Sequence, residues 1–335
     1  MKLGLIISNR CNARCTHCST SCGPSRSDHL PDADIFELMN QAVRLAQNQL
    51  VEFLLSGGEP FLDLERLLHL VRHGHSLGAG VTCVTNGYWA ASDAKARALL
   101  GAVREAGLNV LAVSTSRFHQ QFVNKQRVER VLRLSREIGL PCALKYARTA
   151  SDAESPDEVQ HWATAAGAHT VQDFPIIPYL SAGASLPDDD YLRQPGLPEG
   201  GCPAALLTVR EDGEAFMCPQ PGAQNPLLAL GNAQRTGLAR IRSRHYLGGA
   251  QQLLRNHGPI HFAREIQARG LSHRLRAAYA GVCDLCAHIA SDPEMAVIAA
   301  ECAQTYAAEQ LSGIADVLVE PSKLHGEVRS AAGRQ

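Results

Sequence analysis

The sequence predicts an α/β protein: a partial (β/α)6 barrel followed by a small C-terminal α+β domain. Short β-rich runs alternate with amphipathic helical patterns through the first half of the chain. From residue 50, these runs recur about every 30 residues, which is the length of a βα unit and indicates a parallel sheet. The pattern stops after six units, too few to close an eightfold barrel. A doubly wound open sheet is the alternative.

The individual elements follow from local patterns. Strands are expected at residues 2–8, 50–56, 81–85, 109–114, 141–146 and 169–175. The first helix follows Asp32, with apolar residues at helical spacing: Ile35, Leu38, Met39, Ala42 and Ala46. The clearest helix start is Ser155, followed by Pro156 and two acidic residues, which suit the positive end of a helix.

The second half of the chain has a different texture. Asp212 and Gly213 lie between two short β-rich runs and predict a hairpin. Helical sequence fills residues 234–280, and a final helix is expected from Asp292 to about residue 311. The expected division is a barrel at 1–185, a linker at 186–201, a second domain at 202–312 and a polar tail at 313–335.

Composition excludes several classes of protein. The 335 residues carry a formal net charge of −1 and a mean hydropathy of −0.12, so no bulk attraction to nucleic acid or an anionic membrane is expected. No stretch approaches the roughly 20 apolar residues of a membrane helix. The apolar run at residues 3–7 is too short for a secretory signal, so we expect a cytoplasmic protein.

The eleven cysteines are unusual for such a protein. Structural disulfides are rare in a reducing compartment, so clustered cysteines indicate metal binding or chemistry. Eight of them are clustered: Cys11, Cys15, Cys18 and Cys22; Cys202 and Cys218; Cys283 and Cys286. The isolated Cys83, Cys142 and Cys302 are expected to be small buried apolar residues.

The first cluster has the spacing CxxxCxxC, formed by Cys11, Cys15 and Cys18 directly after the first predicted strand. In parallel α/β proteins, active sites lie at the carboxyl ends of the strands. Three thiolates can hold three irons of a four-iron cluster. One iron then lacks the protein ligand that ordinary four-cysteine clusters provide. Such an open position can bind a substrate or cosubstrate.

The next two loops of the predicted sheet reach the same edge. Gly57, Gly58, Glu59 and Pro60 follow the second strand, and Asn86 follows the third. Paired glycines let a ligand approach the backbone closely, although they also suit an ordinary turn. Glu59 can accept hydrogen bonds from an ammonium group.

Taken together, CNARCTHC and SGGEP resemble the radical S-adenosylmethionine (SAM) superfamily, with the resemblance spanning about residues 1–185. It implies a four-iron four-sulfur cluster held by Cys11, Cys15 and Cys18, with SAM chelating the fourth iron. It also implies an enzyme in which a reductant such as flavodoxin or ferredoxin supplies an electron. SAM is then cleaved to a 5′-deoxyadenosyl radical that abstracts hydrogen from a substrate.

The resemblance assigns roles residue by residue. Beside the methionyl part of SAM it places Gly57, Gly58, Glu59 and Pro60. His17 would lie beside the adenine, Ser114 would contact the ribose, and Asn86 is a weaker candidate contact. The chain departs from the family where Ser116 replaces a frequent acid, and residues 181–184 lack a frequent Gly-Arg-Ala. Cys22 could be a fourth ligand or a hydrogen-atom donor, but an incidental role is favoured because a fourth ligand would close the SAM site.

The remaining clustered cysteines suggest a second metal site. The predicted hairpin returns the strand bearing Cys218 toward Cys202, and a close pair, Cys283 and Cys286, can complete a four-thiolate set. Structural zinc also fits this pattern. The spacing resembles the twitch domain, a shortened SPASM domain, of radical SAM enzymes, which implies an auxiliary four-iron four-sulfur cluster. Four-cysteine ligation suits an electron acceptor, and hence an oxidation of the substrate.

The substrate is less defined. Near the expected mouth of the barrel, substrate or SAM carboxylate ligands could be Arg117, His119, Lys145 and Arg148. Relatives with such domains modify ribosomally made peptides or oxidise small antibiotic precursors, and we favour a peptide. With the first strand starting at residue 2, no fused N-terminal recognition module is expected, so a separate peptide-recognition protein is a possible partner. The alternatives are a dehydrogenase or epimerase of a small-molecule or sugar precursor, a non-catalytic iron-sulfur or SAM-binding protein, and a zinc-ribbon interaction protein.

Overall fold

The computed structural model describes residues 1–178, 186–202, 206–219 and 226–319, with side chains to residue 312. Its main feature is one nine-stranded sheet with the order β10-β9-β8-β1-β2-β3-β4-β5-β6. The six barrel strands are β1 (Lys2–Ser8), β2 (Glu52–Gly57), β3 (Gly80–Thr85), β4 (Val110–Thr115), β5 (Cys142–Arg148) and β6 (Thr170–Pro175). Each lies parallel to the next, with registers such as Leu3↔Phe53 and Val113↔Leu144.

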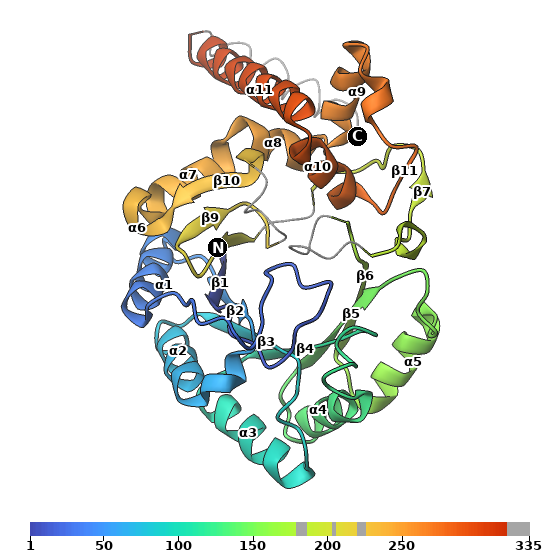
Figure 1. Ribbon diagram of the computed structural model, residues 1–335. Coiled ribbons are helices and arrows are strands. Elements are labelled where there is room, and N and C mark those ends of the chain that lie inside the picture. Colours follow the sequence, from blue (N-terminus) through green and yellow to red (C-terminus); the bar gives the residue numbers. More distant parts are fainter. Residues whose placement is uncertain (179–185, 203–205, 220–225, 320–335) are drawn as a thin grey trace, which may run out of the picture.

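This strand order confirms the partial barrel. The six strands follow one another in sequence order without the reversal that defines a doubly wound sheet, so all their crossover helices lie on the outside of the arc (Figure 1). These helices are α1 (Asp32–Ala46), α2 (Leu64–Ser76), α3 (Asp93–Glu105), α4 (Lys125–Glu137) and α5 (Pro156–Ala166).

The outer helices form where the sequence predicts them because each has one apolar face. In α1 the buried residues are the five expected: Ile35, Leu38, Met39, Ala42 and Ala46. The start of α5 is a capping box, in which Ser155 accepts from the Glu158 amide and the Glu158 carboxylate accepts from the Ser155 amide. The helices and strands share one core that includes Leu5, Phe53 and Leu144.

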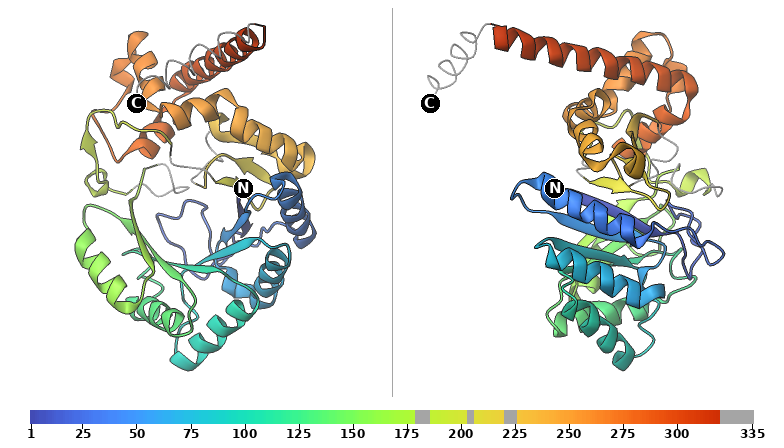
Figure 2. Two further views of the ribbon diagram at one scale, coloured as in Figure 1. Left: turned by 180° about the vertical axis from the view of Figure 1, so that it is seen from behind. Right: turned by 90° about the vertical axis from the view of Figure 1, so that its left-hand side faces the viewer.

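The C-terminal half extends this sheet. The predicted hairpin forms as β8 (Leu207–Val209) and β9 (Glu214–Phe216), and β10 (Ala229–Asn232) follows at the edge. β8 lies parallel to β1, so the hairpin continues the barrel sheet beyond its first strand. The remaining helices lie above it (Figure 2): α6 (Ala233–Thr236), α7 (Leu238–Leu247), α8 (Gly249–Asn256), α9 (Ile260–Ala268), α10 (Val282–Ser291) and α11 (Pro293–Val319).

The segment predicted to be a linker is packed against the barrel. It contains the short 3-10 helix η2 (Asp188–Asp190) and β7 (Gln194–Pro195), which pairs with β11 (Ala278–Tyr279). Asp190 is buried, and its carboxylate binds Arg117 and Ser151 from the loops that follow β4 and β5. In the described part of the chain, the other 3-10 helices are η1 (Pro60–Asp63), η4 (Pro226–Leu228) and η5 (Ser272–Arg274).

The last helix is longer than expected. Asp292 caps α11 by accepting from the amides of Glu294 and Met295, as predicted. α11 continues to Val319 instead of about residue 311, because it carries no proline after its first residue and no glycine-rich break. It therefore runs past the predicted start of the tail, while residues 320–335 lie outside the described part. No helix in the described ranges is long and apolar enough to cross a membrane.

Candidate active site

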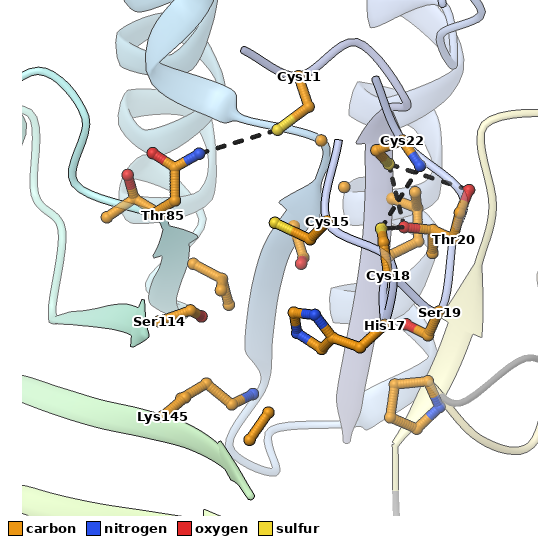
Figure 3. A pocket seen from close by; sticks show the side chains of 18 of the residues that line it. Cys11, Cys15, His17, Cys18, Ser19, Thr20, Cys22, Thr85, Ser114 and Lys145 are labelled. Carbon is orange, nitrogen blue, oxygen red and sulfur yellow. Dashed lines mark hydrogen bonds between the residues drawn. The ribbon is translucent and has the colours of Figure 1, made fainter. Parts of the chain in front are cut away.

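A cavity of about 310 Å³ opens at the carboxyl ends of the barrel strands. The loop after β1 supplies a large share of its wall, with Cys11, Cys15, His17, Cys18, Thr20 and Cys22. In Figure 1 this loop lies inside the arc of strands, and Figure 3 shows its sulfur atoms facing the same space. Cys11, Cys15 and Cys18 therefore lie around one cavity at this edge of the sheet, where the sequence predicted them.

Backbone hydrogen bonds hold this loop in place. The amide of Cys11 donates to the Gly23 carbonyl at 3.1 Å, and the amide of Gly23 donates to the Asn9 carbonyl at 3.2 Å. Within the loop, the Cys18 amide donates to the Cys15 carbonyl at 3.0 Å. The cysteines thus lie on a closed turn whose two ends are tied together, which fixes their spacing before any ligand binds.

The thiols differ in their electrostatics. Burial raises the pKa of Cys11 to about 11 and that of Cys15 to about 12. A hydrogen bond from Cys22 instead lowers the pKa of Cys18, with Thr20 acting in the same direction. The Cys11 sulfur accepts from the Ala13 amide at 3.4 Å, which favours its thiolate form. Ligation to a metal centre requires thiolates, so metal and protons compete at Cys11 and Cys15.

The thiol set suits a cluster better than a single ion. Zn–S bonds of about 2.3 Å place the sulfurs of a tetrahedral zinc site about 3.8 Å apart. Among the described residues, no three His, Cys, Asp or Glu side chains gather closely enough to hold one ion. Thiolates are the usual protein donors of iron-sulfur clusters, so a cavity lined by Cys11, Cys15, Cys18 and Cys22 has a donor set that fits such a cluster.

The glycine pair after β2 lies directly on the end of β1. A Cβ on Gly57 would lie 2.1 Å from the Ser8 carbonyl oxygen, and one on Gly58 would lie 1.9 Å from that of Arg10. The Gly58 amide donates to the Ser8 carbonyl at 2.7 Å. Both glycines line the cavity, and Gly57 has a φ of +140°, which other residues rarely adopt. The close backbone approach therefore requires glycine at both positions.

Glu59 lies behind the cavity wall as a brace between two loops. Its carboxylate accepts from Thr85 Oγ1 and the Asn86 amide, each at 2.7 Å, and from the Phe61 amide at 3.1 Å. Burial raises its pKa to about 7. Pro60 is buried as well and begins the short helix η1 (Pro60–Asp63). Neither Glu59 nor Pro60 lines the cavity. The Glu59 carboxylate accepts its hydrogen bonds from the protein's own donors instead of facing a ligand.

Residues 5–166 match the family model of the radical SAM superfamily. The chain contains a radical SAM domain. A relative in Bacillus subtilis (strain 168), YydG, provisionally named a peptide biosynthesis protein, is 25% identical over 231 residues, covering 65% of this chain and 69% of YydG. The radical SAM domain at residues 5–166 makes this protein an enzyme of the radical SAM type, and that superfamily uses SAM and a four-iron four-sulfur cluster.

Solved structures share the fold. Native anSMEcpe with bound AdoMet has a TM-score of 0.54 at 14% identity, covering 94% of this chain and all of that one. Streptococcus suis SuiB bound to S-adenosylmethionine has a TM-score of 0.51 at 13% identity, covering 72% of this chain and 64% of SuiB. At such identities the likeness shows the fold of the radical SAM domain and nothing finer.

Within the radical SAM domain, His17, Asn86 and Ser114 all line the cavity. His17 packs against Phe118 and His119, with ring centroids 4.9 and 4.7 Å away. Desolvation lowers the pKa of His17 to about 4 and that of His119 to about 3, so both rings are neutral at physiological pH. The pair forms an aromatic wall with a polar edge.

Several further wall residues were not predicted from the sequence. Phe174 and Ile176 come from the end of β6, and Thr208 comes from β8. Ser116, noted only as a departure from the family, lies within hydrogen-bonding distance (2.8 Å) of His119 Nδ1. The signal for Thr208 was absent because nothing in the local sequence shows that β8 pairs with β1.

The four candidate carboxylate ligands divide into two groups. His119 and Lys145 line the cavity, and Lys145 points into it from β5 (Figure 3). Desolvation lowers the pKa of Lys145, and no described residue forms an ion pair or hydrogen bond with its side-chain ammonium. Arg117 pairs with Asp190, and Arg148 donates to Asp173 at 2.9 Å, so both arginines brace loops.

The second cysteine set lies in the C-terminal half. Cys283 and Cys286 are three residues apart on α10 and thus share one helix face. The amide of Cys202 donates to the Leu254 carbonyl at 2.7 Å. The charge of Cys202 contributes to the raised pKa of the Cys283 thiol, after burial. Cys218 follows β9 and is buried. The isolated Cys83, Cys142 and Cys302 are buried, as predicted.

Proposed function

We propose that this radical SAM enzyme oxidatively modifies a ribosomally made peptide. The observation that carries the proposal is the cavity described above. One wall holds Cys11, Cys15 and Cys18 beside the close-approach glycines, and the other presents Lys145 and His119 to a substrate. The predicted departure at residues 181–184 lies outside the described part of the chain and does not bear on this assignment.

The residues of the chain would divide the work by position. Cys11, Cys15 and Cys18 would hold three irons, and the bound cluster with SAM would supply a 5′-deoxyadenosyl radical. Gly57 and Gly58, which line the cavity, would contact the methionyl end of SAM. Glu59 and Pro60 would support this contact from behind by fixing the loop.

The other proposed SAM contacts come from residues that line the same cavity. The His17 ring would lie against the adenine, and Ser114 and Asn86 would be within reach of the ribose. Phe118, Ile176 and Tyr191 form a buried apolar cluster that contacts Cys15, and it would keep water from the radical. A reductant such as flavodoxin or ferredoxin would deliver the electron.

The peptide substrate is supported by the likeness to YydG, through its name alone. The oxidative outcome rests on the second cysteine set. A closed cluster on Cys202, Cys218, Cys283 and Cys286 would accept the electron that the substrate radical loses. The electrostatic effect of Cys202 on the pKa of Cys283, and the shared helix face of Cys283 and Cys286, support this set.

The test replaces two members of this set together. With short peptides encoded beside the gene as substrates, Cys218→Ala with Cys286→Ala should still release 5′-deoxyadenosine but form no product that has lost two hydrogens. Cys302→Ala removes a buried thiol outside the set and is the matched control. Full product formation by the double variant would show that the second set carries no electron.

A further inference from the structure

Cys22 and Thr20 are two cavity residues that the proposed function does not use. Cys22 is buried, and its sulfur lies 3.0 Å from Thr20 Oγ1. Both residues also reach Cys18: its sulfur accepts from the Cys22 amide at 3.4 Å and lies 3.6 Å from Thr20 Oγ1. Figure 3 shows these contacts as one small network around the Cys18 sulfur.

The backbone is turned to make this network. Ser21, between Thr20 and Cys22, has a φ of +52°, a left-handed conformation that non-glycine residues seldom adopt. Two residues further on, the Gly23 amide donates to the Asn9 carbonyl. Such a conformation persists only where surrounding contacts impose it. Here its effect is to direct the amide of Cys22 onto the Cys18 sulfur and the thiol of Cys22 onto Thr20 Oγ1.

Donors around a cluster sulfur have a defined electrostatic effect. Reduction adds negative charge to the cluster, and hydrogen bonds to its sulfurs stabilise that charge, which makes the reduction potential less negative. Residues behind a ligand also fix its orientation. The amide of Cys22 and the hydroxyl of Thr20 provide such donors on one side of Cys18, and the Cys22 thiol holds that hydroxyl in place.

We propose that Cys22 and Thr20 are positioning residues that hydrogen-bond the Cys18 sulfur in the cluster-bound enzyme and raise the cluster's reduction potential. This inference rests on the proposed function in one respect: it takes Cys11, Cys15 and Cys18 to be the cluster ligands. Its consequence is that reduction, the step before SAM cleavage, comes within reach of a flavodoxin- or ferredoxin-type donor.

The test is a redox titration, followed by electron paramagnetic resonance, of anaerobically reconstituted protein. Cys202→Ala, combined with Cys218→Ala, is introduced in every sample to remove the second set from the signal. In that background, Cys22→Ala and Thr20→Val should each shift the midpoint potential to a more negative value. Cys22→Ser, which keeps a donor at the same place, should have a midpoint potential close to that of the parent protein.

Iron content and the matched control separate the outcomes. Cys302→Ala should leave the midpoint unchanged, since that thiol is on α11. An unchanged midpoint in both Cys22→Ala and Thr20→Val, with full iron content, would overturn the inference. A loss of about one iron per cluster in Cys22→Ala alone would also overturn it, by making Cys22 a ligand. If the parent protein binds no cluster at all, the proposed function fails instead.

Discussion

At the scale of single residues, Glu59 shows how the site is held together. Its buried carboxylate binds donors from its own loop and from the loop after β3. Burial raises its pKa from 4.5 to about 7, so the folded protein retains a proton that the unfolded chain has lost between these values. Because the folded state binds more protons in this window, the free energy of unfolding should fall as the pH rises through it.

We therefore predict a pH-dependent difference between the natural protein and Glu59→Gln. From about pH 4.5 to about pH 7, the contribution of Glu59 to the free energy of unfolding should fall by roughly 3 kcal/mol and then level off. Glu59→Gln cannot titrate and should lack this slope. Urea unfolding of both proteins across this range measures it, and parallel curves would show that Glu59 titrates normally.

Some residues of the candidate site could be predicted from the sequence, and others could not. The spacing of Cys11, Cys15 and Cys18 predicted a shared site because three like ligands on one loop have few other uses. Phe174 and Thr208 carry no such pattern. Their place in the cavity wall depends on how strands distant in sequence pack, which local spacing does not encode.

At the scale of elements, the loop after β2 depends on the absence of side chains. Gly58→Ala places a Cβ against the Arg10 carbonyl, and the loop must then move away from β1. We expect a loss of roughly 1–3 kcal/mol of stability and weaker SAM binding. Thermal unfolding and equilibrium dialysis with SAM measure the two effects.

Gly101 provides the matched control. It lies inside α3, and a Cβ there would meet no atom within 4 Å. Gly101→Ala should therefore raise stability by about 0.5–1 kcal/mol, because alanine favours the helix. Equal effects of the two substitutions would contradict the close-approach role of Gly58.

Elements were predicted well where the pattern is local. The six barrel strands lie within two residues of their expected bounds, and the Ser155 capping box formed as expected. The packed state of residues 186–193 was missed, because the acids and prolines that suggest a linker also suit a short 3-10 turn whose Asp190 finds Arg117.

At the scale of the whole molecule, one sheet joins the two halves of the chain. β8 hydrogen-bonds to β1, so the C-terminal hairpin and the barrel share backbone pairing as well as a core. The sequence could predict each hairpin strand but not this pairing, because the pairing of strands so far apart in the chain leaves no mark in local composition.

Continuity of the sheet predicts cooperative unfolding. Trp89 and Trp162 are the two tryptophans and both lie in the barrel, whereas far-UV circular dichroism reports on all helices and strands. The urea transitions followed by fluorescence and by circular dichroism should coincide. Separate transitions would show that the C-terminal half unfolds on its own.

The central claim is that Cys11, Cys15 and Cys18 hold a cluster with one iron open to SAM. Its most direct test is anaerobic reconstitution with iron and sulfide, followed by SAM and dithionite, with 5′-deoxyadenosine measured by chromatography. The natural protein and Cys302→Ala should form it, and Cys15→Ala should not. If the reconstituted natural protein forms none, or if Cys15→Ala forms as much, the claim is contradicted.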